Sequence, residues 1–193
     1  MLRGAGGVAV ASGSDKAIDH AEEVEKFWGK ILMTFLRALV FTLIVPCSVA
    51  VYVPLFVLKT EWQFHFTGSN FIGFFIISIG ALGYFWTVIS FLLQGKGTPA
   101  IWFTKKLSFL IGKEPSKTVT GGLYRFSRNP MYLSVFISIL GLGIFKENFF
   151  ILVFAAIVFV LFHLAVVFIE EPHLRKKFGE SYKEYFNKTR RWL

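Results

Sequence analysis

Two polar stretches of the chain carry the groups that could do chemistry, and they flank a short apolar hairpin. Residues 120–132 read TGGLYRFSRNPMY, and residues 170–187 read EEPHLRKKFGESYKEYFN. Because the hairpin runs out and back, both stretches should meet at the same end of it. A pocket formed where the two stretches meet would suit a zwitterionic or cationic ligand. Carboxylates bind an ammonium group, arginine binds a carboxylate, and tyrosine faces attract a positive centre.

The carboxylates of Glu170 and Glu171 follow an apolar segment directly, where an ionised group is costly to desolvate and usually has a partner or a task. His163 precedes Glu170 by seven residues and so shares its helical face, while Arg125 and Arg128 lie at the other leg of the hairpin. Two interpretations stay open. One is a structural ion pair that joins the legs, with His163 hydrogen-bonded inside a bundle. The other is a ligand pocket with carboxylates on one wall.

The composition is that of a membrane protein. Hydrophobic residues make up 54% of the 193 residues, and 24 residues are Phe, whereas a soluble domain is about 45–50% apolar. The single cysteine, Cys47, excludes a disulfide within the chain. A net charge of +9 could indicate nucleic acid, but in a chain this apolar we expect anionic lipid headgroups as the partner and no nucleic acid.

Four apolar segments predict four transmembrane helices in an all-α, polytopic fold. They are residues 38–58, 71–93, 131–145 and 149–169. Pro46 and Pro54 should kink the first segment, and the third is short for a hydrocarbon core of about 30 Å. Small residues should let the second and third segments pack closely against other helices. These small residues are Gly73, Gly80, Ala81 and Gly83 in the second segment, and Ser134, Ser138 and Gly141 in the third.

The remaining segments are polar or mixed. We expect residues 1–30 to form a tail with a surface helix at 15–30, and residues 31–193 to form one transmembrane domain. The connection 94–128 contains an apolar piece, residues 101–111, that carries two lysines and predicts an interfacial helix.

Lysine and arginine gather in the N-terminal tail, in the connection 94–128 and in residues 170–193. The positive-inside rule therefore places both termini and the connection in the cytosol. Residues 170–193 also carry apolar residues at near-helical spacing, which predicts a cytosolic amphipathic helix.

Several other chemistries lack their motifs. The chain has no Walker motif, and no Gly-x-Gly-x-x-Gly follows a strand. Its four histidines show no metal-ligand spacing, so we expect no metal site.

Taken together, the two polar stretches resemble the integral-membrane methyltransferases typified by isoprenylcysteine carboxyl methyltransferase, with the phospholipid methyltransferases as relatives. The shared pattern is Gly-x-Tyr-(x)3-Arg-His/Asn-Pro-x-Tyr, an apolar hairpin, Glu-Glu-x-x-Leu-x-x-x-Phe-Gly-x-x-Tyr-x-x-Tyr and a final Arg-Trp. In this chain it is carried by Gly122, Tyr124, Arg128, Asn129, Pro130, Tyr132, Glu170, Glu171, Leu174, Phe178, Gly179, Tyr182, Tyr185, Arg191 and Trp192. Residues 95–100, GKGTPA, are similar to an element of many prokaryotic members, so the resemblance covers residues 94–193.

The resemblance implies a cytosol-facing pocket for S-adenosylmethionine in residues 94–193. By position, Glu170 matches the family glutamate near the reacting groups, and Arg128 would support the pocket or the acceptor; these are the catalytic candidates. The residues implied to bind the cofactor are Lys117, Thr118, Val119, Tyr124, Asn129, Pro130, Met131, Tyr132 and Glu171.

Methyl transfer from a sulfonium is an in-line displacement, so catalysis would come mainly from alignment and desolvation, without a metal. Glu170 would orient the acceptor or the cofactor ammonium, or act as a base if the acceptor must lose a proton. Asn129 stands where the eukaryotic carboxyl methyltransferases have histidine. The acceptor stays open between the carboxylate of a prenylated cysteine, or a similar lipid-like group, and a phospholipid amine. A non-catalytic four-helix scaffold or transport subunit is the interpretation from another class.

Overall fold

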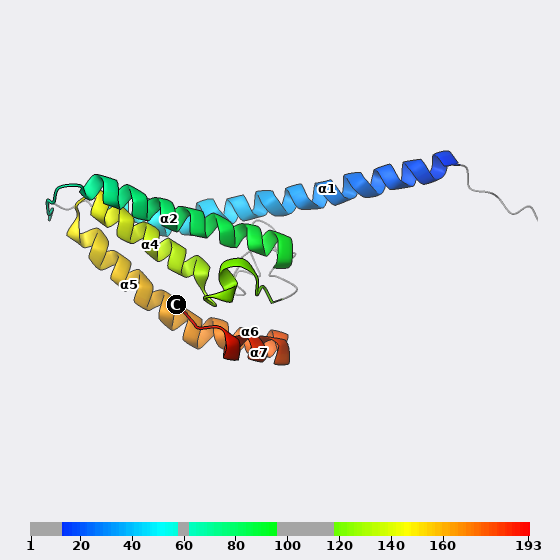
Figure 1. Cartoon of the computed structure of the whole chain (residues 1–193). Helices are drawn as coiled ribbons and strands as arrows, with labels where there is room; N and C mark the ends of the chain where they lie inside the picture. Colours follow the sequence, from blue (N-terminus) through cyan, green and yellow to red (C-terminus); the bar gives the residue numbers. More distant parts are fainter. Residues whose placement is uncertain (1–12, 58–61, 96–117) are drawn as a thin grey trace, which may run out of the picture.

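The computed structural model describes residues 13–57, 62–95 and 118–193, and within them the chain is all-helical, with two isolated bridges and no strand. Lys117 and the segments 96–100 and 101–111 lie outside the described residues. In Figure 1, helices α2, α4 and α5 lie side by side, α6 and α7 continue from one end of α5, and α1 projects well beyond them. The predicted helical class is therefore confirmed.

Helix α1 (Gly13–Ile44) is longer than the sequence predicted. It runs unbroken where a surface helix and a separate span were expected, because no proline or helix-breaking cluster lies between them. The helix ends at the turn residue Val45, directly before Pro46, whose ring disfavours a helical conformation in the preceding residue. A π-helix, Ser48–Val57, follows and contains Pro54. The helix thus departs from regular α-helical geometry near both prolines, while the kink itself stays a prediction.

Three helical stretches of the described residues are long and apolar enough to cross a membrane: Leu32–Phe56, Ser69–Gln94 and Phe149–Phe178. Helix α4 (Pro130–Phe145) is also apolar but has only 16 residues, so a fourth crossing stays a prediction. Large apolar side chains cover the outward faces of the helices; Leu82, for example, is 71% exposed. Such surfaces are stable only in lipid, as expected for an integral membrane protein.

Helices α2 (Ser69–Ser90) and α4 pack at close range through small residues. A Cβ atom added to Gly80 would lie 2.7 Å from the backbone nitrogen of Ser138 and 2.8 Å from the carbonyl oxygen of Ser134. One added to Gly141 would lie 2.6 Å from the backbone nitrogen of Ile77. The two predicted small-residue faces therefore meet each other, and their backbones come too close for larger side chains.

A tight turn joins α4 to α5 (Phe149–Ala165) and ties this end of the bundle together. Asn148 caps α5 by accepting a hydrogen bond from the backbone of Ile151 at 3.2 Å. The Glu147 carboxylate accepts hydrogen bonds from Ser69, the first residue of α2, and pairs with His65. The start of α2 is thereby fixed to the α4–α5 hairpin.

At the opposite end, α5 continues into a π-helical turn, Val166–Glu170, and then α6 (Glu171–Phe178). The sequence predicted one C-terminal helix, but the structure has two, since α7 (Glu180–Lys188) follows a break at Gly179. Gly179 has a φ of 56°, a conformation that is strained for residues with a Cβ atom. Glu170 and Glu171 therefore lie within a continuous helical rod, where the π-turn meets α6.

Candidate functional site

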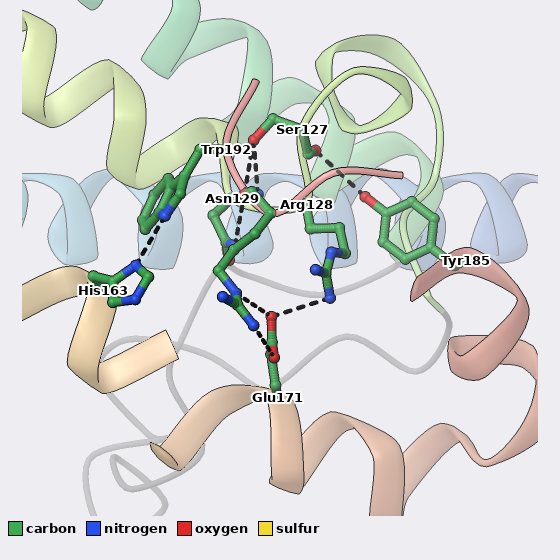
Figure 2. Close-up of polar contacts among 8 residues, drawn as sticks. Ser127, Arg128, Asn129, His163, Glu171, Tyr185 and Trp192 are labelled. Atoms are coloured by element: carbon green, nitrogen blue, oxygen red, sulfur yellow. Dashed lines mark hydrogen bonds and ion pairs between the residues drawn. The ribbon is translucent and has the colours of Figure 1, made fainter. Parts of the chain in front are cut away.

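The C-terminal tail returns to the segment before α4 and holds it. The backbone N–H of Arg128 donates to the carbonyl of Arg190 at 2.8 Å. The Ser127 hydroxyl and the Asn129 amide both donate to the carbonyl of Arg191, at 3.2 and 3.0 Å (Figure 2). The Asn129 backbone N–H donates to the Ser127 hydroxyl at 3.1 Å. These bonds fix the N-terminus of α4 to a segment about 60 residues away in the sequence.

Glu171 lies at the centre of a three-residue charge network (Figure 2). Its Oε1 is 3.0 Å from Nη1 of Arg128 and accepts from Nε of Arg191 at 2.8 Å, while Oε2 accepts from Nη2 of Arg191 at 3.0 Å. Only 7% of the Glu171 side chain and 8% of the Arg128 side chain are exposed. Hydrogen bonding to Glu171 raises the pKa of Arg191 above its usual value. The structural ion-pair interpretation therefore describes Glu171, with Arg128 as one partner and Arg191 as a second partner that the sequence analysis did not anticipate.

His163 is also a structural contact. Its Nδ1 accepts a hydrogen bond from the indole N–H of Trp192 at 3.1 Å, and the two rings stack with centroids 6.1 Å apart. The Trp192 ring packs on Phe159 as well, at 4.9 Å. The last residues of the tail are thus anchored on α5.

Glu170 has a different environment from its neighbour Glu171. The Tyr132 phenol, in the first turn of α4, interacts with the Glu170 carboxylate through a side-chain hydrogen bond. Burial, and then the charge of Glu170, raise the pKa of Tyr124 well above its usual value. Glu170 therefore interacts with a tyrosine, while the adjacent Glu171 is paired with arginines. Glu170 also ends a π-helical turn, a feature that is frequent at functional sites.

The tyrosines belong to a small core of their own beside the site. Tyr124 and Val119 pack with Tyr182 and Tyr185 of α7. The Tyr185 hydroxyl donates to the carbonyl of Tyr124 at 2.7 Å and lies 3.4 Å from the carbonyl of Ser127 (Figure 2). Burial raises the pKa of Tyr185. A turn of 3-10 helix, Gly122–Arg125, carries Tyr124. It packs against α2, since a Cβ atom added to Gly122 would lie 2.7 Å from the indole nitrogen of Trp86. This core attaches α7 to the connection before α4.

The structure brings most of the predicted site residues to one end of the hairpin. Pro130 opens α4, Tyr132 packs on Phe162 with ring centroids 4.7 Å apart, and Met131 packs against the main core and Phe41. Thr118 lies 3.4 Å from the hydroxyl of Ser181. Lys117 is outside the described residues, and Arg125 is exposed.

Three residues that contact the site have no role that is predictable from the sequence alone. Arg191 and Trp192 were part of the quoted pattern, so their positions were visible, but nothing in the sequence showed where the tail folds. Phe186 was not singled out. Its ring lies 3.8 Å from the guanidinium carbon of Arg128 and 4.2 Å from that of Arg175, so it supports the buried arginine by cation–π contact.

The sequence of this part of the chain matches a known protein family. Residues 69–181, more than half of the chain, match the family described as phospholipid methyltransferase. The chain belongs to the phospholipid methyltransferase family. The matched residues include α2, the α4–α5 hairpin, both carboxylates and α6. The family is related to the isoprenylcysteine carboxyl methyltransferases, as the sequence pattern predicted.

Two curated relatives match a shorter part. Over 81 residues the chain is 31% identical to the nickel-cobalt-cadmium resistance protein NccN of Alcaligenes xylosoxydans xylosoxydans. Over the same length it is 32% identical to the cobalt-zinc-cadmium resistance protein CzcN of Cupriavidus metallidurans. Each match covers 42% of this chain but only 38% and 37% of the relatives. No solved structure matches the chain. In the part of the chain that the structure describes, no group of three or more His, Cys, Asp or Glu is placed to hold a metal ion.

Proposed function

We propose that the protein transfers a methyl group from S-adenosylmethionine to a lipid-like acceptor that reaches the site from the membrane. The observation that carries this proposal is the Glu170 carboxylate at the end of the π-turn between α5 and α6, where it interacts with Tyr132 and its charge acts on Tyr124. The membership in a methyltransferase family supports the reaction class.

The residues at this end fit a sulfonium cofactor. When bound, S-adenosylmethionine supplies an activated methyl group on a positively charged sulfur. Tyrosine ring faces attract such a positive centre, and a carboxylate in a partly buried site adds a negative potential that water screens only weakly. We propose that Glu170, Tyr124 and Tyr132 provide this environment, with Thr118, Val119, Asn129, Pro130 and Met131 around them and Lys117 beside them in sequence.

The contacts of Glu171 and Arg128 support a different role for this pair. Both oxygens of Glu171 are engaged by arginines, and the Asn129 amide is engaged by the tail. We propose that Glu171 holds Arg128 and the tail in place, so that Asn129 and Tyr132 keep their positions at the start of α4. Glu171 would then act on the cofactor indirectly, as a positioning residue.

The task of Glu170 depends on the acceptor. A phospholipid amine must lose a proton to become a nucleophile, and Glu170 would then act as the base. The carboxylate of a prenylated cysteine is already a nucleophile, so Glu170 would only orient the reacting groups. Both acceptors fit a membrane methyltransferase. We also propose that α4 crosses the membrane, with both termini and the site in the cytosol.

The first test measures binding of S-adenosylmethionine and S-adenosylhomocysteine to the purified full chain in detergent by calorimetry. The variants are Glu170→Gln and Tyr132→Ala, with Glu184→Gln as the control because Glu184 is exposed and pairs only weakly with Lys188 at 3.6 Å. Loss of one charge-assisted contact should weaken binding about 10- to 100-fold in Glu170→Gln. Both site variants should lose methyl transfer while remaining folded, and Glu184→Gln should behave as the unmodified protein.

The acceptor is then screened with a labelled methyl group, using phosphatidylethanolamine in one arm and a farnesylated cysteine in the other. Methylation of either one supports the enzyme and selects the acceptor class. If a well-folded sample binds neither cofactor form, with or without added lipid, the non-catalytic interpretation replaces this proposal.

A further inference from the structure

A cavity of about 350 Å³ lies on the polar face of α6 and α7, apart from the proposed methyl-transfer residues. Its lining residues are Arg175, Gly179, Glu180, Lys183, Phe186 and Asn187. Glu170, Tyr124 and Tyr132 do not line it. The break between the two helices at Gly179 forms one side of the hollow, so the cavity depends on the geometry that this glycine allows.

The cavity presents a stacked arginine. The guanidinium carbon of Arg175 lies 4.2 Å from the centroid of the Phe186 ring. A guanidinium group that stacks on an aromatic ring keeps its in-plane N–H donors available for a ligand. Its orientation is also partly fixed in advance, which lowers the entropic cost of binding a planar or tetrahedral anion.

Two further donors complete the lining. Lys183 pairs with Glu180 at 3.3 Å, but these side chains are 67% and 87% exposed, so the pair is weak and the ammonium group can turn toward an anion. Asn187 contributes an amide that can donate as well. A guanidinium fork, an ammonium group and an amide match the oxygens of a phosphate group.

The cavity also lies close to the headgroup layer if the hydrocarbon core ends at Ile169, the last residue before the two carboxylates. Ile169 is still 42% exposed in the apolar helix, and α6 carries the chain out of it. Arg175 follows six residues later, which is roughly 9 Å along a helix. The headgroup layer extends about 5–8 Å beyond the hydrocarbon core on each side. The basic last turn of α6, which contains Arg175, Lys176 and Lys177, therefore begins just beyond this layer, from where long side chains can reach its phosphate groups.

We infer that the α6–α7 cavity binds the phosphate of an anionic lipid headgroup, held by Arg175, Lys183 and Asn187. Occupation of the cavity would tie α6 to α7 across Gly179. The inference does not depend on the proposed methyl transfer, because no residue of the cavity is proposed to contact the cofactor or the acceptor.

The test follows the unfolding temperature of the full chain in a neutral detergent as short-chain phosphatidylglycerol or phosphatidylcholine is added. Phosphatidylglycerol should raise the unfolding temperature in a saturable way, and phosphatidylcholine should not. Arg175→Gln and Lys183→Gln should each weaken the apparent affinity about tenfold, as expected for loss of one charge-assisted contact. Lys176→Gln is the matched control, since it removes the same charge from the same helix outside the cavity.

Three results would overturn the inference. Equal weakening in Lys176→Gln would show attraction to the basic face in general. Equal effects of the two lipids would show that the cavity does not select an anionic headgroup. The same saturable shift with inorganic phosphate or glycerol phosphate would assign the cavity to a soluble anion. If Arg175→Gln is already unstable without lipid, Lys183→Gln decides, because Lys183 is largely exposed.

Discussion

Replacement of Glu171 by glutamine should destabilise the protein more than any single change to its partners in the tail. The substitution keeps the shape of the side chain but leaves Arg128, whose side chain is 8% exposed, without its counter-charge. Breaking a buried ion pair by removing one partner costs about 3–5 kcal/mol. We expect the lower end, about 3 kcal/mol, because the Phe186 ring still lies 3.8 Å from the Arg128 guanidinium.

The matched substitution Arg191→Gln, at the exposed end of the charge network, should destabilise the protein less. Arg191→Gln leaves the Arg128–Glu171 pair intact at 3.0 Å, and the Arg191 side chain is 31% exposed, so water screens part of its interaction. We expect about 1–2 kcal/mol for this variant. For a chain of this size, about 1 kcal/mol corresponds to about 2–4 °C in the unfolding temperature.

The assay is thermal unfolding in detergent, followed by tryptophan fluorescence, with Glu184→Gln as a surface control expected within about 0.5 kcal/mol. Combining Glu171→Gln with Arg191→Gln should cost less than the sum of the two, because they remove the same contacts. A loss of less than about 1 kcal/mol in the free energy of unfolding of Glu171→Gln, or a larger loss in Arg191→Gln, would refute a stabilising role of the buried Glu171–Arg128 pair.

Two further changes test the packing and the turn at the opposite end. Gly80→Ala should destabilise the protein by about 2 kcal/mol or more, because its Cβ atom would lie 2.7 Å from a backbone nitrogen of α4. The control Gly29→Ala, which has open space around it, should be neutral or stabilising. Equal effects of the two substitutions on the unfolding temperature would exclude close packing as the cause. The hydrogen bonds from Ser69 and then His65 hold the pKa of Glu147 below its ordinary value of 4.5. The contribution of Glu147 to folding stability is therefore present above pH 4.5, and it is lost as the pH falls through the lowered pKa of this carboxylate. The unfolding temperature should drop more steeply below about pH 4.5 in the unmodified protein than in Glu147→Gln, and parallel pH profiles would contradict this.

The sequence predicted those features that depend on local composition. Apolar runs of sufficient length can only be helices in a bilayer, so the helical class follows from them. The distortions at Pro46 and Pro54 follow from the geometry of the proline ring, and the close contact at Gly80 follows from the size of a small residue. The pairing of Glu171 with Arg128 was one of two open interpretations, because both charges were visible at the ends of the hairpin.

The residues at which helices begin and end were predicted less well where no capping residue or proline marks the boundary. The sequence placed a boundary near residue 30, but α1 continues to Ile44 because nothing in that region ends a helix. It also missed the break at Gly179, because a single glycine inside a helical pattern can be tolerated or can end the helix, and the choice depends on what the following helix packs against. Here α7 turns to place Tyr185 on the carbonyl of Tyr124.

By itself, the sequence determined that the chain is a helical membrane protein of a methyltransferase family, because these conclusions rest on composition, segment length and a spaced pattern of residues. Only the tertiary structure decided the different surroundings of Glu170 and Glu171. Adjacent residues on a helix point in different directions, and what each one meets depends on segments far away in the chain. The tail that brings Arg191 to Glu171 and the first turn of α4 that brings Tyr132 to Glu170 are such segments, and their positions follow from packing that no local pattern records.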